Sequence, residues 1–182
     1  MLRCLVICGP PCAGKSTLAR ALATRYRWPL LAKDDYKERV FAHLGADDRE
    51  FSRRVSALAW DLLLGEVARL LAGGVNCVVE GNLRSAEAAR LREIGARSGA
   101  ALVEIRCCAA PAVLLARYRA RAESGTRHAG HVDLEALPEV ERELAAGEED
   151  RPGLGAQLLI HDTSAGFDAR ALLAAVDAIL GA

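Results

Sequence analysis

The sequence predicts an α/β domain built on a buried parallel sheet. Five short apolar runs without helical periodicity alternate with longer segments in which apolar residues recur at helical spacing. The first run leads into a glycine-rich loop and then a helical segment, as in a strand–loop–helix unit. With 182 residues, 52% of them hydrophobic, and no repeat or linker, the chain is expected to form one domain over residues 1–182.

Each apolar run is expected to form a strand that is buried on both faces, because such strands are nearly continuous in Val, Ile and Leu. The expected strands are residues 2–8, 29–32, 75–80, 101–107 and 157–161. The expected helices are residues 15–26, 36–44, 48–71, 85–98, 111–122, 134–146 and 168–180. Strands that alternate with helices favour right-handed crossovers and therefore a parallel sheet.

Two polar, glycine-bearing stretches lie between the fourth and fifth expected strands. Residues 123–131 (ESGTRHAGH) and 147–155 (GEEDRPGLG) are expected to be irregular. An insertion at this place can form a mobile lid over a site at the edge of the sheet. We expect such a lid at about residues 117–133.

The glycine-rich loop is the most specific motif in the chain, because it matches G-x-x-x-x-G-K-[ST] between a strand and a helix. Its residues, with the one that follows, are Gly9, Pro10, Pro11, Cys12, Ala13, Gly14, Lys15, Ser16 and Thr17. The N–H groups of such a loop surround phosphate oxygens. Lys15 is expected to neutralise the β- and γ-phosphates and Ser16 to ligate Mg²⁺, so the loop predicts binding of ATP and Mg²⁺. A kinase, a motor and a switch all remain compatible with it.

Two adjacent aspartates follow the second expected strand, at the edge where α/β sheets bind ligands. Asp35 and Glu38 have capping-box spacing, so Asp35 is expected to cap a helix that begins at Tyr36. Asp34 would then face the phosphate loop, where it could accept the proton of a substrate hydroxyl. Alternatively, both aspartates compete for one helix cap.

The segment Lys33-Asp34-Asp35-Tyr36-Lys37 resembles the Arg-Asp-Asp-Tyr-Arg segment of polynucleotide 5′-hydroxyl kinases, at a similar distance after the phosphate loop. The wider group includes zeta-toxin-like and chloramphenicol-phosphotransferase-like kinases. This resemblance implies a P-loop NTPase fold with a five-stranded parallel sheet in the order 2-3-1-4-5. It also implies that Asp34 is the general base and that Lys37 contacts the substrate, although lysine lacks the bidentate fork that arginine offers to a phosphate.

Glu80 and Asn82 follow the third expected strand, at the same edge of the sheet. The kinases that the chain resembles carry Asp-x-Asn there, so Asn82 matches and Glu80 supplies a longer carboxylate. Glu80 is expected to orient a magnesium-bound water or to bind the acceptor. A simple loop or helix-cap carboxylate is the alternative.

Arg117 and Arg121 lie four residues apart in an expected helix and so share one face. They resemble the Arg-x-x-x-Arg lid of the same kinases. They are expected to clamp the transferring phosphoryl group, with Arg117 also contacting the nucleotide. A solvated basic helix face is the alternative.

His128, His131 and Asp133 follow in the expected lid. They offer too few ligands for a convincing metal site, so we expect the histidines to touch nucleotide or substrate. After the fifth strand, residues 162–166 (DTSAG) resemble the loop that wraps adenine in small P-loop kinases.

Composition limits the partners. Lys and Arg together number 24, as do Asp and Glu, so a nucleic-acid partner is possible but unsupported by charge. The six cysteines form no Cys-x-x-Cys pair, and no secretory segment is evident, so we expect a reducing cytoplasm. No apolar run is long enough to span a membrane.

Together these features predict a kinase that moves the γ-phosphate of ATP to a hydroxyl of a small molecule. Polynucleotide 5′-hydroxyl phosphorylation is the second hypothesis. A nucleotide-binding switch or regulatory ATPase is a third, of a different class, and it would have no need of Asp34 as a base.

Overall fold

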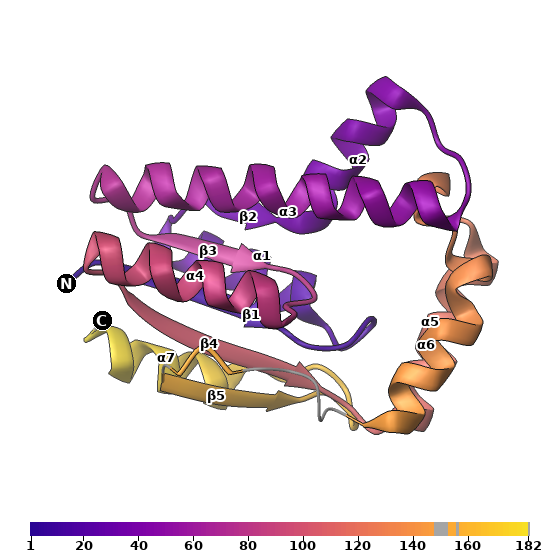
Figure 1. Cartoon of the computed structure of the whole chain (residues 1–182). Coiled ribbons are helices and arrows are strands. Elements are labelled where there is room, and N and C mark those ends of the chain that lie inside the picture. The colour runs from indigo at the N-terminus through magenta and orange to yellow at the C-terminus, as the bar shows by residue number, and fades with distance from the viewer. Residues whose placement is uncertain (148–152, 156, 182) are drawn as a thin grey trace.

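The computed structural model, which describes residues 1–147, 153–155 and 157–181, confirms the predicted α/β fold (Figure 1). Five parallel strands form one sheet in the order β2-β3-β1-β4-β5, as the resemblance implied. The strands are β1 (Arg3–Cys8), β2 (Leu30–Ala32), β3 (Cys77–Glu80), β4 (Ala101–Cys108) and β5 (Gln157–Asp162). All five carboxyl ends therefore meet at one edge of the sheet.

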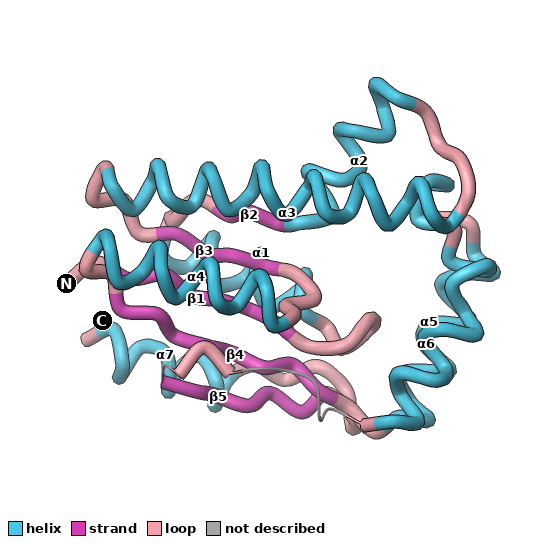
Figure 2. The backbone as a smooth tube through the Cα atoms, viewed as in Figure 1, coloured by secondary structure: helices cyan, strands magenta, loops and turns pink. Residues whose placement is uncertain are grey.

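Helices cover both faces of the sheet (Figure 2). The side chains of α3 and α4 form one core layer with the sheet, and those of α1 and α7 form the other. The helices of the described residues are α1 (Lys15–Tyr26), α2 (Lys33–Leu44), α3 (Arg49–Ala72), α4 (Ser85–Ser98), α5 (Pro111–Ser124), α6 (Asp133–Ala146) and α7 (Arg170–Leu180), with a short 3₁₀ helix η1 (Ala129–His131). None of these helices has the length and apolar character needed to cross a membrane.

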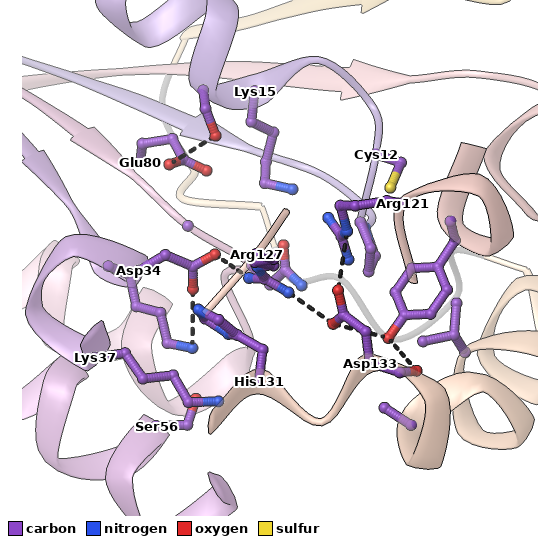
Figure 3. Close-up of a pocket in the computed structure, with 18 of the residues that line it drawn as sticks. Cys12, Lys15, Asp34, Lys37, Ser56, Glu80, Arg121, Arg127, His131 and Asp133 are labelled. Carbon is purple, nitrogen blue, oxygen red and sulfur yellow. Dashed lines mark hydrogen bonds and ion pairs between the residues drawn. The ribbon is translucent and has the colours of Figure 1, made fainter. Parts of the chain in front are cut away.

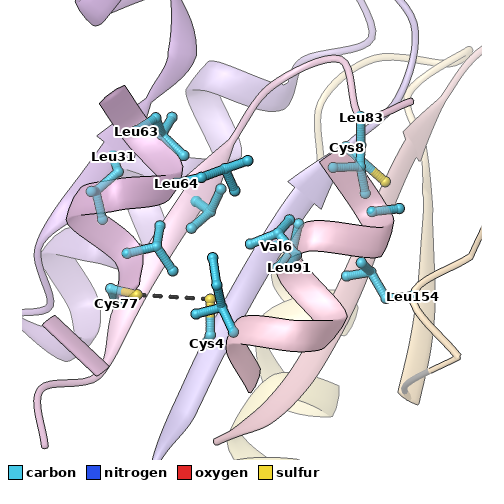
Figure 4. Close-up of a cluster of buried hydrophobic side chains, with 14 of the residues drawn as sticks. Cys4, Val6, Cys8, Leu31, Leu63, Leu64, Cys77, Leu83, Leu91 and Leu154 are labelled. Atoms are coloured by element: carbon cyan, nitrogen blue, oxygen red, sulfur yellow. Dashed lines mark hydrogen bonds between the residues drawn. The ribbon is translucent and has the colours of Figure 1, made fainter. Parts of the chain in front are cut away.

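The central strand β1 supplies side chains to both core layers in alternation. Cys4 and Val6 pack toward α3 and α4 (Figure 4), whereas Leu5 and Ile7 pack toward α1 and α7. All four are almost fully buried, which explains why β1 is apolar without a polar phase. The Sγ atoms of Cys4 and Cys77 lie 3.7 Å apart on neighbouring strands as free thiols.

Helices α5 and α6 pack against each other beyond the carboxyl edge of the sheet, far from the two termini (Figure 1). We call residues 111–146 the helical arm. Part of the stretch expected to be irregular is helical, because α5 continues to Ser124 and η1 forms at 129–131. Of the second irregular stretch, residues 148–152 lie outside the described residues.

One helix boundary corrects the sequence interpretation. Helix α2 begins at Lys33 rather than Tyr36, its N-cap is Ala32, and no side chain caps it. Asp35 is therefore not the cap. The strand β2 continues directly into the helix, so Asp34 and Asp35 both occupy the first turn, where their charges complement the helix dipole without a capping hydrogen bond.

The core predicts a contrast between two adjacent leucines of α3. Leu63 is 0% exposed and Leu62 is 47% exposed. Leu63→Ala should lower the free energy of unfolding by about 2–5 kcal/mol, because it leaves a cavity under the sheet. The matched change Leu62→Ala should cost less than about 0.5 kcal/mol. Equal losses in urea unfolding would contradict the packing described for α3.

Candidate active site

A cavity of about 630 Å³ lies at the carboxyl edge of the sheet (Figure 3). Its walls come from the phosphate loop and α1, the start of α2, the N-terminal half of α3, the end of β3 and the arm. The structure brings most of the predicted site residues to this cavity. They are Pro11, Cys12, Gly14, Lys15, Ser16, Thr17, Asp34, Lys37, Glu80, Asn82 and Arg121.

The phosphate loop passes tightly over β4. A Cβ atom on Gly9, whose φ is +134°, would lie only 2.0 Å from the carbonyl oxygen of Cys107, so glycine is required there. Gly14 also has positive φ, as does Cys12 at +63°, which is unusual for a residue with a side chain. Lys15 lies across the loop and donates from Nζ to the carbonyl oxygen of Pro10 at 2.7 Å. The ammonium is thus held at the place where phosphates are expected.

Ser16 and Glu80 form a pair of oxygen ligands beside the loop. The Ser16 hydroxyl donates to Glu80 Oε2 at 3.3 Å, and Glu80 is buried at the end of β3. Burial raises the pKa of the Glu80 carboxyl, and the charge of Lys15 opposes that effect. A hydroxyl and a carboxylate side by side suit Mg²⁺, which prefers hard oxygen ligands. The donor set therefore fits the predicted magnesium ion.

Asp34 lines the cavity from the start of α2 (Figure 3), and its side chain is 42% exposed. Its Oδ1 lies 3.5 Å from Lys33 Nζ, and its Oδ2 accepts a hydrogen bond from Arg127 Nη2. Burial alone would raise the pKa of the Asp34 carboxyl, but the positive charges of Arg127 and Lys33 hold it well below its usual range. Asp34 is consequently ionised at neutral pH.

Lys37 is buried in the wall next to Asp34, with 4% of its surface exposed. Its Nζ donates to Ser52 Oγ at 2.8 Å and lies 5.4 Å from the centre of the Phe41 ring. Within the described residues no carboxylate forms an ion pair with it. Burial, reinforced by the charge of Lys33, lowers the pKa of Lys37 to about 7.

The two arginines of the expected clamp have different partners. Arg121 lines the cavity, donates from Nε to Asp133 Oδ2 at 3.1 Å, and stacks over the ring of Tyr118. Arg117 is not among the described residues that line the cavity. It instead connects the P-loop to the segment after β5. It donates to the carbonyl oxygens of Cys12 and Thr163 and to the Thr163 hydroxyl. The phosphoryl clamp remains a prediction for Arg121, and Arg117 lies where a nucleotide contact is expected.

Sequence reasoning missed Arg127 and Asp133 as a pair. Arg127 Nη1 donates to Asp133 Oδ1 at 2.8 Å while Nη2 reaches Asp34 across the cavity. Asp133, at the start of α6, also accepts from Tyr118. Arg127 lies in an irregular stretch without periodicity, so no local sequence pattern predicts where its side chain points.

The histidines of the arm pack against α2. His128 stacks on the Phe41 ring at 5.4 Å, and the buried His131 places Nε2 2.9 Å from Glu38 Oε1. Burial and the nearby Arg127 lower the pKa of His131 to about 3, so its ring is neutral at neutral pH. Among the described residues, no group of three or more Asp, Glu, His or Cys side chains is arranged to hold a metal.

The segment after β5 lies beside the P-loop, where the sequence placed an adenine loop. Thr163 donates from N to the carbonyl oxygen of Cys108 at 2.8 Å and from Oγ1 toward that of Ala13 at 3.4 Å. Phe167, 44% exposed, lies close to Gly14. This places an aromatic ring beside the start of α1.

The fold and site define a P-loop protein of the kinase-like class, with the strand order and phosphate loop typical of such enzymes. More particularly, a family model matches residues 5–146, and the chain belongs to that family, AAA_33, described as "AAA domain".

Solved structures agree with this assignment. A protein from Chloroflexus aurantiacus J-10-fl, whose description proposes a kinase, is 34% identical with a TM-score of 0.84, and the match covers 97% of each chain. Shikimate kinase from Bacteroides thetaiotaomicron is 18% identical over 100% of both chains, with a TM-score of 0.54. The Pnkp1/Rnl/Hen1 RNA repair complex matches at 17% identity and a TM-score of 0.56, over 84% of this chain and 48% of its own. The last two show the fold alone. No curated protein matches the sequence.

The buried Lys37 predicts a pH dependence of stability. Its pKa is about 7 in the folded protein and near 10.5 ordinarily, so between these values the unfolded chain binds the additional proton. Stability should therefore rise with pH across that window. Relative to Lys37→Met, the wild-type protein should gain more than about 1 kcal/mol in free energy of unfolding from pH 7 to 10. Parallel pH profiles for the two proteins would show that Lys37 is not perturbed.

Proposed function

We propose that this protein is an ATP- and Mg²⁺-dependent phosphotransferase that phosphorylates a hydroxyl group of a small molecule. The observation that carries the proposal is the cavity that Lys15 and Asp34 share. The P-loop offers a cation for the phosphates, and the start of α2 offers an ionised carboxylate in the same cavity. A switch that only binds nucleotide has no use for such a carboxylate across an open cavity.

The proposed reaction is a direct transfer. The acceptor oxygen bonds to the γ-phosphorus, the bond to the β,γ-bridging oxygen breaks, and the proton of the hydroxyl passes to Asp34. Lys15 and Arg121 neutralise charge on the phosphates. Ser16 and Glu80 would hold Mg²⁺, whose charge would supply further neutralisation when the ion is bound. Closure of the arm would exclude water from the transfer.

A small acceptor is supported by the size and charge of the site. The cavity of about 630 Å³ falls within the usual range for small-molecule sites. Arg49 and Arg53 at its rim already bind Glu139 of the arm, and the chain carries no net charge, so the rim offers little to a long polyanion. Six free cysteines support a reducing cytoplasm as the compartment.

A transfer screen tests the proposal. Purified protein, Mg²⁺ and γ-³²P-labelled ATP would be incubated with sugars, antibiotics, nucleosides and oligonucleotides, with Lys15→Ala as the blank. We expect label on a small hydroxyl compound with wild-type protein only. Label on oligonucleotide ends would favour polynucleotide phosphorylation instead. Hydrolysis that depends on a protein partner, without transfer, would favour the switch.

The division of labour between the two aspartates gives the next prediction. Asp34→Asn keeps the shape and removes the base, so transfer should fall about a hundredfold or more while ATP affinity is not weakened. Asp35→Asn should be mild, because Asp35 is exposed in the first turn of α2 and caps nothing. Transfer rate and ATP affinity would be measured for both. An active Asp34→Asn beside an inactive Asp35→Asn would reverse the assignment.

Replacing Arg117 and replacing Arg121 should have different kinetic effects. Arg121→Ala should lower the transfer rate more than it weakens ATP binding, because Arg121 faces the cavity. Arg117→Ala should mainly weaken ATP binding, because Arg117 joins the P-loop to the segment after β5. Single-turnover rates and calorimetric affinities would distinguish the two effects. Identical kinetic profiles would contradict these separate roles.

A further inference from the structure

Arg127 forms a bridge across the cavity, from the arm to the proposed base (Figure 3). One end of its guanidinium binds Asp133 of the arm and the other binds Asp34 at the start of α2. Lys33 lies near the other Asp34 oxygen. Both oxygens that could accept a proton therefore already face cations.

The backbone around Arg127 is held in place by α2. Gly130 packs so closely on Phe41 that a Cβ atom would lie 2.5 Å from the ring. His128 stacks on the same ring, and His131 contacts Glu38 one turn further along α2 than Asp34. The segment that carries Arg127 is thus docked onto α2, the helix that carries Asp34. This packing holds the Arg127 backbone in a fixed position relative to Asp34.

We propose that Arg127 is a positioning residue that keeps Asp34 from acting as a base until a γ-phosphate draws the guanidinium away. This inference rests on the proposed function. A carboxylate held between Arg127 and Lys33 is a weak proton acceptor, and its pKa is well below the usual range. The charged and titratable groups around it are Arg127, Lys33 and His131, with Lys37 beside it on α2 and Glu80 at the end of β3.

The γ-phosphate of a bound nucleotide carries more negative charge than one carboxylate, and it suits the same planar fork. When Arg127 turns to it, Asp34 is released to take the proton of the acceptor hydroxyl. The acceptor oxygen then bonds to the γ-phosphorus, and the bridging oxygen leaves with its electron pair on the nucleoside diphosphate. Base activation is in this way coupled to the presence of the group to be transferred.

The test follows the Asp34 carboxyl carbon by ¹³C NMR as pH is varied, and needs no acceptor. In free wild-type protein Asp34 should stay ionised to the acid limit of the fold, and in Arg127→Gln the pKa of Asp34 should be measurably higher, because one of its two neighbouring cations is gone. Arg127→Lys should keep the pKa low by restoring a cation. Arg119→Gln is the matched control, because Arg119 pairs with Glu141 on the surface of the arm. The ring-current shift of Gly130 reports whether the segment is still docked on Phe41.

The second part of the test adds Mg²⁺ with either ADP or AMP-PNP, and of these two nucleotides AMP-PNP retains a γ-phosphate. AMP-PNP should raise the pKa of Asp34 more in the wild type than in Arg127→Gln, because in the variant only the charge of the phosphate acts on Asp34. ADP should leave the pKa of Asp34 in the wild type low. Equal shifts in both proteins, or an unchanged pKa in a docked Arg127→Gln, would overturn the inference. A protein that binds neither nucleotide would overturn the proposed function, and with it the exchange, while the free-state titrations still decide the pairing.

Discussion

The passage of the P-loop over β4 at Gly9 is the contact on which the site depends. Gly9 has no side chain, so the loop can pass close to the Cys107 carbonyl oxygen and turn directly from the end of β1 into α1. That turn places Lys15 and Ser16 at the carboxyl edge, where the third strand delivers Glu80 in register with β1. A parallel sheet brings the carboxyl ends of all its strands to one edge. A residue at such a strand end is therefore placed at the site by its position in the strand alone.

The arm is joined to the rest of the site mainly by charge. Its α6 contributes Glu139 to Arg49 and Arg53 of α3, and Glu143 to Arg84 before α4. Arg53 and Arg84 are largely exposed, so their ion pairs stabilise the docked arm little and salt screens them, whereas the pair of Arg49 with Glu139 is more buried. The contact of Gly130 with Phe41 adds an apolar element, and it lies in the connection between α5 and α6, beside α2.

The sheet and the P-loop could be predicted from sequence because their signals are local. Five apolar runs gave the strands, and one motif gave the loop that reaches the cavity. The strand order needed the resemblance, since apolar runs do not state which neighbours pair. The start of α2 was misplaced because Asp35 and Glu38 satisfy a capping pattern that the backbone does not use. Arg127 could not be found, because its role depends on Phe41 and Asp133 holding an irregular segment across the cavity.

The charges of the cavity are consistent with a site that is completed by an anion. Among the described residues, the buried Lys37 has the Ser52 hydroxyl as its hydrogen-bond partner and forms no ion pair, and Lys15 lies at the phosphate loop, where it donates to the carbonyl oxygen of Pro10. Arg127 and Arg121 both bind the carboxylate of Asp133, and Arg127 also binds Asp34. Burying the Lys37 ammonium without a carboxylate partner among the described residues costs free energy, and folding alone gives no reason to retain that cost. A triphosphate would offset it by binding to the cations that the fold has already brought together, and the same electrostatics would then set Asp34 free.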